Sequence, residues 1–171
     1  MADNKRRLPM LQPSADGDDE ERPAWQWAGI GGCALLIGFF PLSMLANAYA
    51  KRVLASLVVA SGAAETKAAI TAMTASQRLW LSVVVVIGPL VALALAGLVS
   101  GLTVGRFGGD AGKKEAAVGG LGAAVLISLV SASEVMQKGS GPLGWLLVSS
   151  VVIVLAGASA YLGAHLGLKL R

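Results

Sequence analysis

The segment Gly105–Glu115 contains the residues that come closest to a nucleotide-binding motif, because four glycines precede a pair of lysines. A phosphate-binding loop needs a glycine five positions before its Gly-Lys pair, and a Ser or Thr after the lysine to bind Mg²⁺. Phe107 and Lys114 occupy these two positions instead. We therefore interpret the segment as a glycine-rich turn between two helices. Its basic side chains, Arg106, Lys113 and Lys114, are candidates for contacts with lipid headgroups or with a partner protein.

No other residues combine into a catalytic or metal-binding pattern. His165 is the single histidine, and one imidazole without a nearby carboxylate supplies neither a metal site nor an acid–base pair. Cys33 is the single cysteine and lies in an apolar run, where it is expected to be a small packing residue. The acidic run 16–21 lacks the alternating ligands and closing Glu of a calcium loop. We expect no catalytic site, no metal and no cofactor.

Four long apolar segments must position these residues, and none of the four contains a charged side chain. Crossing the hydrocarbon core of a bilayer takes about 20 helical residues. The segments have 22, 26, 18 and 22 residues and cover 25–46, 79–104, 116–133 and 143–164. All four tryptophans fall at segment edges, where indole rings favour the membrane interface. The sequence therefore predicts an all-α membrane protein, a bundle of four transmembrane helices spanning the domain 25–171.

The composition agrees with this class, and the charges are confined to the tail and to short connections. Of the 171 residues, 55% are hydrophobic and 14% are charged, whereas a soluble domain carries about 25% charged residues. Residues 1–24 hold four basic and six acidic side chains and several prolines, which predicts a disordered charged tail. No basic stripe interleaved with aromatic residues is present, so a nucleic-acid partner is not expected. The lipid bilayer is the expected surrounding.

The connection 47–78 is long for a loop without structure. It has no proline, and Gly62 is its only glycine. Apolar residues recur in it at helical spacing, at Val53, Leu54, Leu57 and Val58 and again at Ala69, Ile70 and Met73. We predict two short helices broken near Ser61-Gly62, which either cover the bundle or extend the first two spans beyond the membrane.

Glycines at intervals of four are the strongest pattern in the spans, and 22 of the 171 residues are glycine, against a usual share of about 7%. Gly97, Gly101 and Gly105 form two overlapping steps in the second span, and Gly163 and Gly167 repeat the spacing near the C-terminus. Glycine lets membrane helices approach closely, in a setting where lipid offers no hydrophobic drive for association. These five glycines are expected at a helix contact, either within one bundle or with a partner subunit or a second copy.

The absence of ionisable groups from the four segments narrows the range of possible functions. Coupled transporters and intramembrane hydrolases usually need such groups inside the membrane. Pro41 and Pro89 interrupt two spans and are expected to kink their helices, which is a structural feature more often than a transport site. The favoured interpretation is a non-catalytic accessory, scaffold or anchoring subunit. The alternative is a small oligomeric pore, permease or holin-like protein with a path lined by Ser82, Ser100, Thr103, Ser128, Ser131, Ser149, Ser150 and Ser159.

The distribution of basic residues gives an expected orientation. With four spans, the tail, the turn 105–115 and the C-terminus share one side of the membrane. That side carries nine Lys and Arg residues and the other side carries five. Loops rich in Lys and Arg stay in the cytoplasm, so we expect a bacterial cytoplasmic membrane protein with both termini in the cytoplasm.

Overall fold

The structure, a computed structural model, describes residues 23–57, 63–109, 111–137 and 142–170, and no strand occurs in these ranges. Five helices make up the described chain: α1 (Ala24–Leu57), α2 (Ala63–Ala72), α3 (Ala75–Phe107), α4 (Lys113–Gln137) and α5 (Pro142–Lys169). The prediction of an all-α fold with extra helix between the first and second spans is confirmed. The predicted N-terminal tail lies outside the described residues, except for its last two positions.

Four of the helices, α1, α3, α4 and α5, are long and apolar enough to cross a membrane. Large apolar side chains cover the outside of the bundle: Met44, Val99 and Val154 are each at least 66% exposed. A surface of this kind in water would drive association, but it is the ordinary surface of a protein in lipid. The chain is an integral membrane protein.

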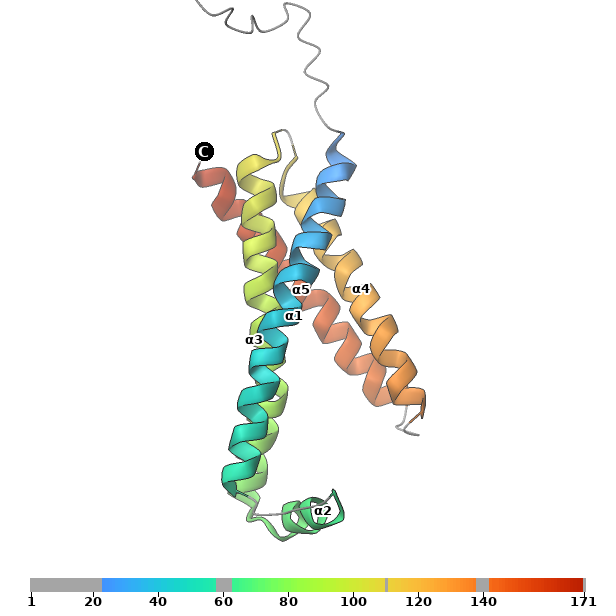
Figure 1. The fold of residues 1–171 in the computed structure, drawn as a ribbon. Helices are drawn as coiled ribbons and strands as arrows, with labels where there is room; N and C mark the ends of the chain where they lie inside the picture. The colour runs from blue at the N-terminus through green and yellow to red at the C-terminus, as the bar shows by residue number, and fades with distance from the viewer. Residues whose placement is uncertain (1–22, 58–62, 110, 138–141, 171) are drawn as a thin grey trace, which may run out of the picture.

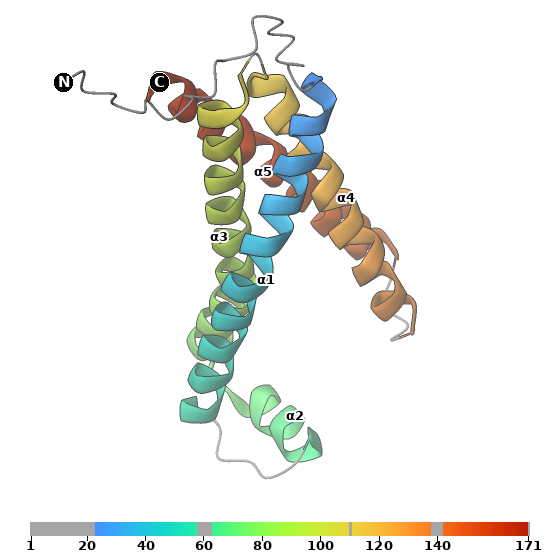
Figure 2. The same ribbon diagram turned by 45° about the horizontal axis from the view of Figure 1, so that its top comes forward.

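Helix α1 runs beside α3 and α4 runs beside α5, and we call these the two pairs (Figure 1). The most extensive helix contact joins the pairs, between α3 and α5. The pairs pack together at the end that contains the start of α1, the α3–α4 turn and the end of α5, which we call the turn end. Toward the opposite end, which we call the α2 end, the pair α4–α5 diverges from the pair α1–α3 (Figure 2). The result is a four-helix bundle that is closed at one end and open at the other.

Helices α1 and α3 are longer than the apolar segments within them. At 1.5 Å per residue, the 34 residues of α1 extend about 50 Å, whereas the hydrocarbon core is about 30 Å thick. Residues 47–57 contain neither glycine nor proline, so nothing ends α1 where its apolar run ends. The first of the two short helices expected in 47–78 is therefore a continuation of α1, and α2 is the second. The expected break at Ser61-Gly62 lies outside the described residues.

A small apolar cluster and a helix cap stabilise the α2 end. Met73 and Leu81 are buried against Leu54, Leu57 and Ile70, which attaches α2 to the ends of α1 and α3. The start of α3 has a reciprocal cap. The Gln77 N–H donates to Thr74 Oγ1 at 3.4 Å, and the Thr74 N–H donates to Gln77 Oε1 at 3.1 Å. This arrangement satisfies two backbone donors that the first turn of a helix leaves free.

In the middle of the bundle and toward the turn end, small residues allow the helix backbones to meet. The main buried cluster contains only two leucines, Leu35 and Leu93, beside four alanines. Ser100 adds a hydrogen bond between helices, because its hydroxyl donates to the carbonyl of Gly31 on α1 at 2.6 Å. Gly109 lies in the α3–α4 turn with a φ of 56°, a left-handed conformation that glycine adopts without steric cost.

The closest helix contact joins α3 and α5 and contains all five glycines that the sequence singled out. On α3, a Cβ added to Gly97 would overlap the Ser159 hydroxyl, and one added to Gly101 would overlap the Ala160 carbonyl. Gly105 meets Ala164 in the same way.

The glycines of α5 complete this contact from the other side. A Cβ on Gly163 would overlap the Leu98 carbonyl, and one on Gly167 would lie 2.6 Å from the Leu102 carbonyl. Each helix therefore presents glycine to the backbone of the other, so these two backbones touch directly over several turns.

We predict that Gly101→Leu destabilises the bundle strongly, because a leucine cannot occupy the space of the Ala160 carbonyl without separating α3 from α5. The expected loss in the free energy of unfolding is at least about 3 kcal/mol. It is measured by titrating the detergent-solubilised chain with a denaturing detergent and following circular dichroism. Gly144→Leu is the matched control, since a Cβ at Gly144 meets nothing within 4 Å, and its effect should stay within about 0.5 kcal/mol. Equal stability of both variants would contradict the packing argument.

Candidate functional site

The glycines of the α3–α5 contact are buried within the chain, so their faces are not available to a partner. The remaining surface contains three features of interest: a groove between α1 and α4, the basic turn end, and a cleft between the diverging parts of α3 and α5.

The groove between α1 and α4 is lined mainly by small residues, and we call it the small-residue groove. It encloses about 300 Å³ and is lined by Ala28, Gly29, Gly32, Cys33, Leu36, Val118, Gly119, Gly122, Ala123 and Leu126. Its floor is the contact of the two helices, where a Cβ on Gly32 would lie 3.1 Å from the Gly119 carbonyl. At its edges, Gly29 and Gly122 have open space where a Cβ would be.

Gly29 and Gly122 therefore have no packing role within the described bundle, in contrast to Gly119. The glycines of α1 were not predicted to form a contact, because they do not recur at intervals of four. Their signal was the Gly31-Gly32 pair inside the first span, with Gly29 two residues before it. A groove with exposed glycines at its edges leaves backbone accessible to a neighbouring helix, and small residues are what membrane helix contacts require.

The basic turn end does not have the geometry of a phosphate-binding loop. The Gly112 N–H, which would point at a bound phosphate, donates instead to Glu115 Oε2 at 2.7 Å. Glu115 thus caps the start of α4. Asp110, in the same turn, lies outside the described residues.

The three basic residues that the sequence singled out at this end lie on two helices, Arg106 on α3 and both lysines on α4. The Arg106 guanidinium carbon lies 5.8 Å from the Phe107 ring centroid, and Lys113 Nζ lies 5.8 Å from the Tyr161 ring centroid. Lys114 is exposed. Cationic groups beside aromatic rings at the end of a span are typical of a membrane interface.

The described part of the chain contains no cluster of side chains suited to metal binding or thiol chemistry. No group of three His, Cys, Asp or Glu side chains lies close enough there to hold a metal ion. Cys33 is exposed and faces the small-residue groove. His165 is partly buried near the end of α5.

The hydroxyl groups considered for a polar path mostly bond to backbone carbonyls. Thr103, Ser131, Ser150 and Ser159 each donate to a carbonyl three or four residues earlier in their own helix. Ser100 bridges α3 and α1, as described above. Ser100 and Ser159 are buried, whereas Ser131 and Ser150 are exposed.

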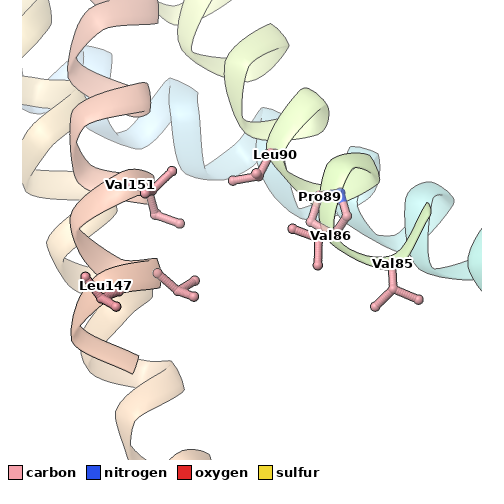
Figure 3. Close-up of a pocket in the computed structure, with 8 residues that line it drawn as sticks. Val85, Val86, Pro89, Leu90, Leu147 and Val151 are labelled. Carbon is pink, nitrogen blue, oxygen red and sulfur yellow. The ribbon is translucent and has the colours of Figure 1, made fainter. Parts of the chain in front are cut away.

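The cleft between α3 and α5 is apolar, and we call it the α3–α5 cleft (Figure 3). It has a volume of about 460 Å³ and is lined by Val85, Val86, Pro89 and Leu90 of α3 and by Leu147, Val148, Val151 and Val152 of α5. It begins where the close glycine contact between the two helices ends. Pro89 forms part of its wall, and α3 continues as a helix through this proline, as α1 does through Pro41.

Comparison with protein-family models, with curated proteins and with solved structures finds no match to this chain. Its function is therefore inferred from its own residues and their geometry.

Proposed function

We propose that this protein is a non-catalytic subunit of a membrane complex, which binds another membrane-spanning protein through the small-residue groove. The observation that supports this proposal is the open space at Gly29 and Gly122. Glycine in a span costs helix stability and is useful where backbones approach. The glycines of α3 and α5 allow a close backbone approach inside the chain. Gly29 and Gly122 allow one only if a helix of another protein lies in the groove.

A second observation supports a role without chemistry of the chain's own. The four apolar segments, 25–46, 79–104, 116–133 and 143–164, contain no Asp, Glu, Lys, Arg or His. The hydroxyls present in them are largely engaged with carbonyls, and Glu115 serves as a helix cap. The alternative function, a small oligomeric pore or permease, would need several copies of the chain to enclose a path.

A photo-crosslinking residue placed at Val118, on the edge of the groove, is predicted to form one discrete product with a different and larger membrane protein. The same residue at Val154, which is 68% exposed on α5, is the matched control and should capture only lipid. Mass spectrometry of the product identifies the partner. A product of two copies of this chain would favour the oligomeric pore, and equal labelling from both positions would contradict a docking groove.

The chain alone is predicted to carry no gradient-coupled transport. Reconstituted in vesicles with an imposed proton or sodium gradient, it should give no uptake of ions or small solutes above that of empty vesicles. The reason is the lack of intramembrane ionisable groups to bind a coupling ion. Coupled uptake that is abolished by Asp110→Asn or Glu134→Gln would show that residues of the connections perform this chemistry.

We further propose that the protein resides in a bacterial cytoplasmic membrane with both termini in the cytoplasm. Among the described residues, each end of the bundle carries four basic side chains: Arg106, Lys113, Lys114 and Lys169 at the turn end, and Lys51, Arg52, Lys67 and Arg78 at the α2 end. The expected orientation therefore depends on the basic residues of the N-terminal tail, Lys5, Arg6, Arg7 and Arg22.

This dependence yields a topology prediction. A fluorescent protein fused to the C-terminus, of a kind that folds only in the cytoplasm, should be bright. Replacing all four basic residues of the tail with glutamine should lower the bright fraction, because the remaining charges balance across the membrane. Unchanged fluorescence in that variant would mean that other charges set the orientation. A dark wild-type fusion would mean that the C-terminus lies on the opposite side of the membrane from the cytoplasm.

A further inference from the structure

The α3–α5 cleft differs in chemistry from every helix contact of the bundle. Its lining consists of valine, leucine and proline, without a glycine, alanine or serine. Membrane helices associate through small residues that let backbones approach, and the α3–α5 contact itself follows this rule. A flexible hydrocarbon chain suits this cleft better than a helix does.

The depth of the cleft places it in one leaflet. Arg106 marks the interface at the turn end, and 20 residues separate it from Val86 along α3. This length corresponds to about 30 Å, the thickness of the hydrocarbon core. On α5, Trp145 lies two residues before Leu147 and marks the opposite interface. The cleft therefore lies within the leaflet at the α2 end.

A second hollow adjoins the cleft and has polar groups. It has a volume of about 400 Å³, and Asn47 and Lys51 of α1 line it together with apolar residues that include Val85. Val85 also lines the α3–α5 cleft, so the two hollows meet at this side chain. Lys51 makes no hydrogen bond or ion pair with the described part of the chain, and it lies at the level of the interface.

The charges around this second hollow favour an anion. The described residues at this end of the bundle carry Lys51, Arg52, Lys67 and Arg78 against two acidic residues, Glu65 and Glu134. Basic side chains near a membrane surface attract anionic headgroups. A polar, cationic hollow that shares Val85 with a neighbouring apolar cleft has the two parts needed to hold an amphiphile.

We propose that this composite site binds one anionic phospholipid from the leaflet at the α2 end, with its phosphate at Asn47 and Lys51 and an acyl chain in the α3–α5 cleft. The lipid fills the space that the diverging helices leave, and it connects the pair α1–α3 with the pair α4–α5 where protein contacts end. This site is separate from the small-residue groove, so it stands independently of the proposed subunit role.

The test uses the full chain reconstituted in vesicles of equal parts phosphatidylglycerol and phosphatidylcholine, then extracted in mild detergent. Native mass spectrometry counts the lipids retained per chain. The wild type should retain one phosphatidylglycerol. Val151→Trp, which fills the cleft, should lose it, whereas Val154→Trp one turn away should retain it. Circular dichroism verifies the helix content, and Leu147→Trp replaces Val151→Trp if that variant does not fold.

The polar part is tested by a pair of exposed neighbours. Lys51→Gln should lower the preference for phosphatidylglycerol over phosphatidylcholine by about fivefold. Arg52→Gln should leave it unchanged, because Arg52 does not line the hollow. The proposal is overturned if the wild type retains no lipid, if the Val151 and Val154 variants retain it equally, or if both charge variants behave alike. A dimer that Val151→Trp dissociates would place a second copy in the cleft and would also overturn it.

Discussion

The direct backbone contact between α3 and α5 is the constraint on which the rest of the bundle depends. Glycines of each helix face carbonyl groups of the other, so the two axes lie closer than any side chain larger than hydrogen would permit. In lipid, this contact gains van der Waals energy that hydrophobic burial does not supply. The contact also brings α1 and α4 together, since α1 packs on α3 and α4 packs on α5. The small-residue groove lies at the resulting contact between α1 and α4.

The same contact explains why the bundle is open at the α2 end. Small residues occupy the α3–α5 interface from Gly97 toward the turn end, but the facing residues of the cleft are β-branched or bulky. Larger side chains at the α2 end keep α3 and α5 apart there, whereas glycines let them touch near the turn end. Two of the hollows on the described surface, the small-residue groove and the α3–α5 cleft, differ in chemistry. One exposes backbone and suits a helix, and the other presents only valine, leucine and proline and suits an acyl chain.

The polar residues of the described chain serve mainly to end helices and to join them. Thr74, Gln77 and Glu115 cap helix starts, and the Ser100 hydroxyl ties α3 to Gly31. A cap and a phosphate site compete for the same backbone donors, so the glycine-rich turn at 105–115 resembles a binding loop in composition while the Gly112 N–H is already satisfied. The residues available for interaction are the exposed glycines and the basic side chains at the two interfaces.

The sequence by itself determined the class of the protein, because charge-free runs of about 20 residues have few stable states outside a bilayer. Four spans and the extra helix before Arg78 followed from hydrophobic length and helical periodicity. The spacing of Gly97, Gly101 and Gly105 indicated a packing face, but it left open whether that face served this chain or a partner. Only the tertiary structure decided this, since the choice depends on which helix the glycines meet. The tertiary structure also shows that Gly119 is buried against α1, whereas Gly122, three residues later, is exposed. The difference arises because burial depends on the rotation of α4 against its neighbours and not on residue type.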